Sequence, residues 1–192
     1  MKRKLTRFSV AVFILTAILC VPGLAYTQAA IKWAKYYGGT GREGDLSLGH
    51  LKDGSTIIAC GSLSADNNLI TNHGSYDIYI SRISKVGETI WERSFGGKFG
   101  EMFGDIVVDD NDNVYFTSGV ESPDGDVIPC SIPGRNFWLV KLDSDGNIIW
   151  QRQFGGPYND QGVWLTIKNN GNVICGGKCE FYNTQTNSNI LS

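Results

Sequence analysis

The sequence predicts an all-β fold assembled from repeated four-stranded units, and three observations support it. The pattern Trp-x-x-x-aromatic-Gly-Gly begins at Trp33, Trp91 and Trp150, at spacings of 58 and 59 residues, and a fixed period of this length is typical of repeat architectures. Short runs rich in β-branched and aromatic residues alternate with Gly, Asp and Asn, as strands alternate with turns. The chain also contains 24 glycines among 192 residues, which indicates many turns.

The first 29 residues have the pattern of a secretory signal peptide. Four basic residues lie within the first seven positions, an apolar run from Phe8 to Cys20 follows, and small residues precede residue 30. A membrane anchor is the alternative, but it needs roughly 20 apolar residues, and Pro22 and Gly23 interrupt this run. We therefore expect residues 30–192 to be exported, into the medium, the periplasm or onto the cell surface, without a membrane span in the mature form.

The most complete repeat unit lies between Trp91 and Trp150. Four of its segments are predicted to be strands: Gly104–Val108, Asn113–Gly119, Asn136–Leu142 and Asn147–Phe154. Four antiparallel strands per unit, with a tryptophan at a fixed place in the last one, are typical of a β-propeller blade. The three tryptophans are predicted to pack between blades, since aromatic rings bury large apolar areas; a sugar-stacking stripe is the alternative.

The remaining segments predict about 2.5 blades and an incomplete propeller. Trp33–Tyr37 would be a fourth strand without the other strands of its blade. Full blades are expected at approximately 38–95 and 96–154, and an incomplete one at 155–192 with strands at Gly162–Lys168 and Asn172–Gly177.

Known propellers have about four to eight blades, so we expect the open ends of this array to be available for self-association. On the last blade we expect three aliphatic residues to lack a covering neighbour: Val163, Leu165 and Ile167.

Charge and cysteine content limit the partners. Without its first 29 residues the chain has 13 basic and 19 acidic groups, which argues against nucleic acid because phosphate binding needs a basic surface. The four cysteines beyond residue 29 permit three disulfide pairings that the sequence does not separate: Cys60, Cys130, Cys175 and Cys179. Cys175 and Cys179 lack the second ligand pair of a structural zinc site, and we expect no metal and no cofactor.

Two aspartate-rich segments, which begin at Asp109 and Asp143, place oxygen atoms at alternate positions as calcium loops do. Neither segment has the Gly and Glu that a helical calcium loop requires at its sixth and twelfth positions, and the sister copies replace Asp109 with Leu51 and Lys168. We interpret both segments as turns held by Asx hydrogen bonds, with calcium binding as the alternative.

Catalysis has little support in this sequence. The only histidines are His50 and His73, and neither a Gly-x-Ser-x-Gly motif nor a glycine-rich phosphate loop with lysine is present. We therefore expect this chain not to be an enzyme.

The candidate binding residues lie in two long loops, Ser62–Ser75 and Val120–Arg135, between the second and third strands of their blades. The loops differ in length and composition while the strands around them repeat, as recognition loops on a rigid scaffold do. Antiparallel order places them on the same face as the blade-to-blade connections. Plain solvent-exposed connections are the alternative. The candidate binding residues are Asp66, Asn67, Asn68, His73, Asp124, Asp126 and Arg135.

GDIVVDDNDNVYFTSGV followed by NFWLVKLDSDGNIIWQRQFGG resembles the repeat of secreted bacterial β-propeller proteins (the SBBP-type repeat), and the resemblance covers nearly all of residues 31–180. It implies a bladed disc that serves as a binding or scaffolding module. We therefore expect a secreted or cell-surface module for protein or glycan ligands, as a piece of a longer protein. Part of a larger propeller enzyme that acts on extracellular polymers is the alternative.

Overall fold

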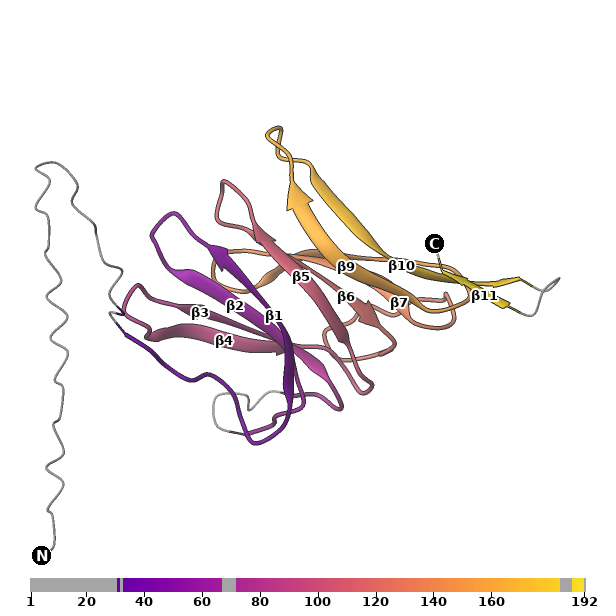
Figure 1. Ribbon diagram of the computed structural model, residues 1–192, viewed down its shortest axis with the longest axis horizontal. Coiled ribbons are helices and arrows are strands. Elements are labelled where there is room, and N and C mark those ends of the chain that lie inside the picture. The colour runs from indigo at the N-terminus through magenta and orange to yellow at the C-terminus, as the bar shows by residue number, and fades with distance from the viewer. Residues whose placement is uncertain (1–30, 32, 67–71, 184–187, 192) are drawn as a thin grey trace, which may run out of the picture. The chain divides into compact units, whose positions relative to one another are not determined.

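The computed structural model describes residues 31, 33–66, 72–183 and 188–191, with side chains as far as Glu180. These residues form strands, turns and bends and contain no helix, which confirms the all-β prediction (Figure 1). The strands belong to the compact unit Trp33–Ser192. Within the described ranges, no helix is long and apolar enough to cross a membrane.

Two four-stranded antiparallel sheets form the centre of this unit. Sheet 1 has the order β1 (Glu43–His50), β2 (Thr56–Ser62), β3 (Asp77–Ile83) and β4 (Thr89–Phe95). Sheet 2 repeats it with β5 (Met102–Val108), β6 (Val114–Val120), β7 (Asn136–Leu142) and β8 (Ile148–Phe154). The four strands predicted for this second unit are correct within two residues at each end.

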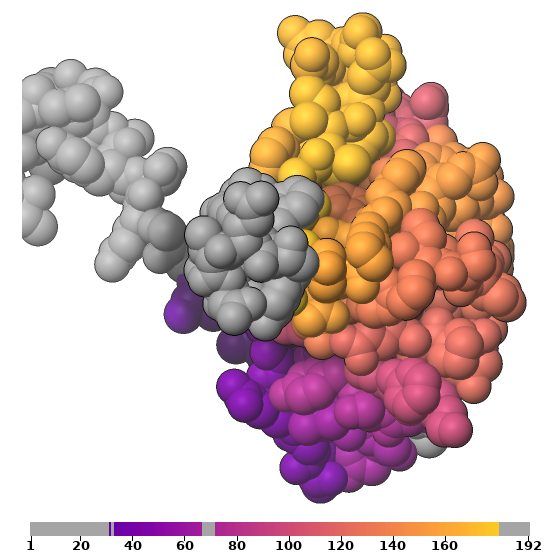
Figure 2. Space-filling model, turned by 90° about the vertical axis from the view of Figure 1, so that its right-hand side faces the viewer, coloured from indigo at the N-terminus to yellow at the C-terminus, as the bar shows by residue number. Residues whose placement is uncertain are grey.

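Sheet 3 contains β9 (Asp160–Ile167), β10 (Val173–Asn183) and the short β11 (Ser188–Leu191), in the order β11-β10-β9. β11 pairs only with Glu180–Asn183, at the far end of β10. Figure 2 shows the yellow part of β10 projecting from the rest of the surface. The sheets lie side by side in chain order and, among the residues that the structure describes, do not close into a ring.

One hydrophobic core joins sheets 1 and 2. It contains Ile57 and Ile80 from sheet 1 together with Phe116, Trp138 and other apolar residues of sheet 2. The Phe116 and Trp138 rings meet edge to face, with centroids 5.3 Å apart, a favoured geometry for aromatic pairs. Side chains alternate between the two faces of a strand. One face of sheet 2 therefore packs on sheet 1, and its other face packs on sheet 3.

Sheet 3 packs on sheet 2 through Leu165, which is 6% exposed and contacts the cluster of Tyr115 and Leu139. Ile167 packs against the same cluster. The prediction that these two residues lack a covering neighbour is therefore wrong. They occupy the positions of Ile106 and Val108 in sheet 2, whose side chains face the preceding sheet, and the exposed side of sheet 3 carries Trp164 instead, 48% exposed.

Trp33–Tyr37 does not form the predicted strand, because no third strand lies beside it to hydrogen-bond with it in the described chain. The segment nevertheless lies against sheet 1 in the way that β4 lies against sheet 2. Trp33 Nε1 donates to the Lys85 carbonyl at 3.0 Å, as Trp91 Nε1 donates to the Ser144 carbonyl at 2.9 Å. Each indole lies against the glycine of that hairpin turn, where positive φ requires glycine.

The first strands of the three sheets are linked by Asp105 on β5. Its Oδ1 accepts a hydrogen bond from Ser47 Oγ of β1 at 2.7 Å, and its Oδ2 accepts one from the Leu165 backbone N–H of β9 at 3.1 Å. One carboxylate therefore contacts both neighbouring sheets.

Candidate functional site

The segment that leads into each sheet contains a hydrogen-bonded motif, Gly-Gly followed after three residues by an acid. The second glycine donates its N–H to this acid, which lies at or next to the start of the first strand: Gly39 to Glu43 at 3.4 Å, Gly97 to Glu101 at 3.3 Å and Gly156 to Asp160 at 2.6 Å. The acid thereby places its carboxyl group against the connection in all three copies.

Two of the candidate binding residues hold these connections in place. Asp66 accepts a hydrogen bond from the Thr40 N–H at 2.9 Å, and Asp124 accepts one from the Lys98 N–H at 2.8 Å. The Thr40 bonds hold the pKa of Asp66 below its usual value. The predicted proximity of loops and connections is therefore confirmed, and these two carboxylates already have intramolecular partners.

A buried acidic pair lies where sheet 1 meets sheet 2. Asp77, at the start of β3, is fully buried, and Glu101, in the connection before β5, is 1% exposed. The two carboxyl groups meet beside Gly96. Asp77 Oδ1 and Glu101 Oε1 have no hydrogen-bond partner in the described chain. Two carboxyl groups this close can hydrogen-bond to each other only when they share a proton.

Burial is the main reason that this pair holds a proton. It raises the pKa of Glu101 to about 8, against hydrogen bonds from Ser122 and Gly97 that lower it, and the charge of Asp77 raises it further. Burial also raises the pKa of Asp77, and hydrogen bonds from His73 partly offset that effect. We name Asp77 and Glu101 the carboxyl junction.

His73 connects the carboxyl junction to solvent. Its backbone N–H donates to Asp77 Oδ2 at 2.6 Å, and its Nδ1 lies 2.9 Å from the same oxygen. Its Nε2 lies 3.7 Å from Asp126 Oδ2. The side chain is 35% exposed and the Asp77 side chain 1%. His73 and Asp126, two of the predicted residues, are therefore close together.

A cavity of about 400 Å³ opens beside His73. Arg93 and Asn147 also line it, and the Arg93 guanidinium donates to Asn147 Oδ1 at 3.0 Å. Charges of both signs surround this cavity, so it matches no single ligand charge.

Arg135 lies apart from His73. Its guanidinium contacts Glu121 at 2.7 Å, and both residues line a second cavity of about 420 Å³, which Glu101 also borders. The structure therefore divides the predicted residues among several places. Asn67 and Asn68 lie outside the described residues.

The two aspartate-rich segments are Asx turns, as predicted. Asp109 Oδ1 accepts hydrogen bonds from the backbone N–H groups of Asn111 and Asn113, and Asp143 Oδ1 accepts the equivalent pair from Asp145 and Asn147. Burial tends to raise the pKa of both aspartates, but the combined hydrogen bonds lower it.

The structure also bears on the predictions for the tryptophans and the cysteines. Trp91 packs against the core between sheets 1 and 2, and Trp150 packs against the cluster between sheets 2 and 3, so packing between sheets is confirmed for these two tryptophans. Trp33 is 42% exposed. The four cysteines beyond residue 29 are free: Cys60 is buried, and Cys130, Cys175 and Cys179 are exposed.

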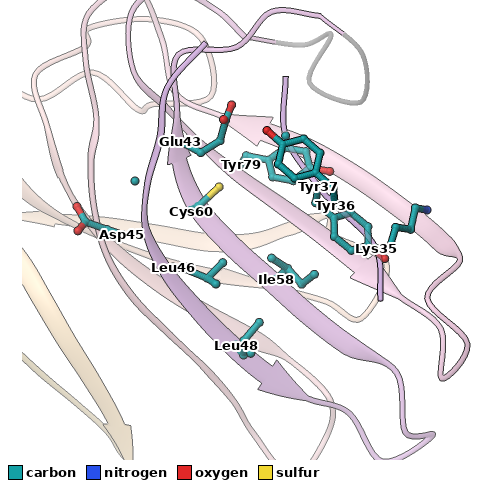
Figure 3. A pocket seen from close by; sticks show the side chains of 12 residues that line it. Lys35, Tyr36, Tyr37, Glu43, Asp45, Leu46, Leu48, Ile58, Cys60 and Tyr79 are labelled. Carbon is teal, nitrogen blue, oxygen red and sulfur yellow. The ribbon is translucent and has the colours of Figure 1, made fainter. Parts of the chain in front are cut away.

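The outer side of sheet 1 forms an apolar surface that sequence reasoning missed. It lines a cavity of about 430 Å³ beneath Lys35, Tyr36 and Tyr37 (Figure 3). We name this surface the open face; its residues are Leu46, Leu48, Ile58, Cys60 and Tyr79. We name residues 33–38, which border it on the side of Tyr79, the strap.

The open face is unevenly covered. Tyr79 is 3% exposed and Cys60 8%, whereas Leu46 is 68% and Leu48 54% exposed. Burial, followed by the charge of Glu43, raises the pKa of Cys60 to about 11. The repeat contained the signal for this surface, because Leu48, Ile58 and Tyr79 align with the core residues Ile106, Phe116 and Trp138.

The comparisons with known proteins give no family and no relative. No protein-family model matches this chain, and no curated protein matches it in sequence. The resemblance to the SBBP-type repeat therefore stays a prediction.

Proposed function

We propose that this chain is an exported module of the β-propeller type that binds a protein partner through the open face. The observation that carries the proposal is the difference in burial between equivalent residues of sheets 1 and 2. Ile106 is 3% exposed against sheet 1, whereas its counterpart Leu48 is 54% exposed. The open face thus has the composition of an interface between sheets, but no sheet of the described residues covers Leu48.

The chemistry of the open face favours the exposed face of a β-sheet as the partner. Sheet 2 presents Phe116 and Trp138 to sheet 1 and meets aliphatic residues there, among them Ile57, Ala59 and Ile80. Leu46 and Leu48 would meet a partner sheet in the same way. Apolar atoms removed from water contribute about 25 cal/mol per Å², which makes exposed leucines on a sheet face a favourable place to dock.

The strap limits where the partner binds. It lies over the half of the open face that contains Tyr79, and the Tyr37 hydroxyl donates to the Gly87 carbonyl at 2.9 Å. Leu46 and Leu48 on β1 remain available. A partner sheet would therefore contact β1, and the strap would border the outer strand of that partner sheet.

Export is the second part of the proposal, and the signal-peptide pattern of residues 1–29 supports it. Amino-terminal sequencing of protein recovered outside the cytoplasm should begin near residue 30. Recovery of the whole chain inside the cell would contradict export.

The binding surface is tested with ANS, a dye that fluoresces on accessible apolar surface. Dilute wild-type protein should bind ANS, and the double variant Leu46→Ser, Leu48→Ser should lose most of the signal. Ile149→Ser, on β8 and 51% exposed, is the matched control and should leave it unchanged. Equal fluorescence of all three proteins would contradict a binding surface at the open face.

A further inference from the structure

We propose that the partner of the open face is a second copy of this chain, which docks the exposed side of its sheet 3 head to tail. This inference rests on the proposed function and names its partner. The two ends of the described array are different surfaces, so the contact joins the sheet 3 end of one copy to the sheet 1 end of the next.

The contact would continue an interface that the structure already contains twice. Gly49 of β1 approaches the side chains of Ile106 and Val108 on β5. One repeat further, Val107 packs on the cluster that contains Leu165 and Ile167 of β9.

A third step of the same pattern requires an acceptor, and the described residues of one copy contain none beyond sheet 3. Thr166 is the β9 counterpart of Gly49 and Val107, and it is exposed. The residues that would receive it are the counterparts of Ile106 and Val108, which are Leu48 and His50 of a second copy. Trp164, beside Thr166 on the exposed side of sheet 3, would enter the same contact.

The strap gives this contact a specific geometry. Trp33 has the same hydrogen bond and the same glycine contact toward sheet 1 that Trp91 has toward sheet 2. It therefore lies where the fourth strand of a preceding sheet belongs. A docked sheet 3 would supply the first strands of that sheet, and the strap would become its outer strand.

A contact between unlike surfaces can be tested by complementation, because a heterologous interface uses a different patch on each copy. Leu48→Glu blocks only the open face, and Thr166→Glu blocks only sheet 3. Both positions are exposed in the single chain, so both variants are expected to fold. Circular dichroism and melting temperature verify this.

We expect wild-type protein to form assemblies of two or more chains by light scattering, and each variant to associate at least about tenfold more weakly, since a charge at a desolvated apolar contact is costly. An equimolar mixture of the two variants retains one intact pair of surfaces and should form dimers that grow no further. Ile149→Glu is the matched control and should assemble like wild type.

Hydrogen exchange supplies an independent readout. In the mixed dimer, the backbone N–H groups of residues 34–37 should be protected in the Thr166→Glu chain alone, because only that chain offers an intact open face. Monomeric mass for wild type, or a mixture that stays monomeric, would overturn the inference. If wild type is monomeric but ANS still binds the open face, the partner is a different protein. If wild type is monomeric and ANS does not bind the open face, the proposed function is contradicted as well.

Discussion

The junction between sheets 1 and 2 and the junction between sheets 2 and 3 have the same backbone plan and different chemistry. The first contains Asp77 and Glu101, and the second contains Asn136 and Asp160 at the equivalent positions. In each, the side chains meet beside the first glycine of the connection, Gly96 or Gly155. Asn136 is uncharged and its Nδ2 donates to the Ile132 and Gly134 carbonyls, whereas two carboxylates at this distance repel each other unless one is protonated. We therefore expect the first junction to depend on pH through its carboxyl pair.

The direction of this dependence follows from the carboxyl junction. The folded protein raises the pKa of Glu101 from 4.5 to about 8, and it also raises that of Asp77. When the pH lies between 4.5 and about 8, Glu101 is protonated in the folded state and has lost its proton in the unfolded state. Stability contributed by the protonated pair is therefore complete below about pH 4.5 and is lost as the pH rises through about 8.

The largest effect is expected from Asn136→Asp, which places a carboxyl pair at the second junction. Asn136 is 3% exposed, and an unpaired buried charge costs about 3–5 kcal/mol. We expect a loss of roughly 3 kcal/mol in the free energy of unfolding at pH 9 and a much smaller loss at pH 5, measured by urea denaturation. Equal losses at the two pH values would show that charge is not the cause.

Glu101→Gln should remove the pH dependence of the first junction. The glutamine amide can donate to Asp77 without a shared proton, while its carbonyl can keep the Gly97 hydrogen bond. We expect the variant to be about 2 kcal/mol more stable than wild type at pH 9. If the two proteins lose stability in parallel from pH 5 to 9, the buried pair does not govern the titration.

Asp77→Asn places an asparagine at the first junction, at the position that Asn136 has at the second. The asparagine can accept the His73 N–H and donate to Glu101, so we expect a gain of about 1–2 kcal/mol at pH 9 and little change at pH 5. Asp53→Asn is the control, because Asp53 is exposed and carries its pKa of about 2 through Ser55 hydrogen bonds. If Asp53→Asn gives a similar gain in the free energy of unfolding at pH 9, the cause is the change in net charge and not the buried pair.

His73→Ala should have the smallest effect, about 0.5–1.5 kcal/mol, because it removes the side-chain bond and keeps the backbone N–H bond to Asp77. The second junction has Ile132 four residues before Asn136, where the first has His73 before Asp77. Thermal melts of His73→Ala and wild type at pH 6 provide the measurement. A destabilisation larger than that of Asn136→Asp would place the histidine, rather than the acidic pair, at the centre of the junction.

The repeat made the strands predictable, because the pattern of apolar residues and turn glycines lies within each unit. The side of sheet 3 that faces solvent could also have been found, by aligning Leu165 with Ile106. The carboxyl junction had a weaker signal, the acid that follows each Gly-Gly pair. Its partner Asp77 lies 24 residues earlier in the chain, and only the packing of two sheets brings the acids together.

The candidate binding residues were harder to predict for a related reason. The sequence predicts Asp66 and Asp124 as binding residues because they are polar groups in variable loops, but a carboxylate beside a connection also accepts hydrogen bonds from the backbone N–H groups of that connection. Composition alone does not separate these two uses. The strap shows the same limit, because Trp33–Tyr37 has the residues of a strand but no strand of the described residues pairs with it.

Asp105 gives the array a mechanical property. Its two oxygens are held by sheets on opposite sides, so a sliding movement of either neighbour along the strand direction stretches a bond to the same carboxylate. A pull applied at one end of the array would be transmitted through this residue to the other end. The inner strands are therefore expected to yield under force together, as one shear unit, rather than sheet by sheet.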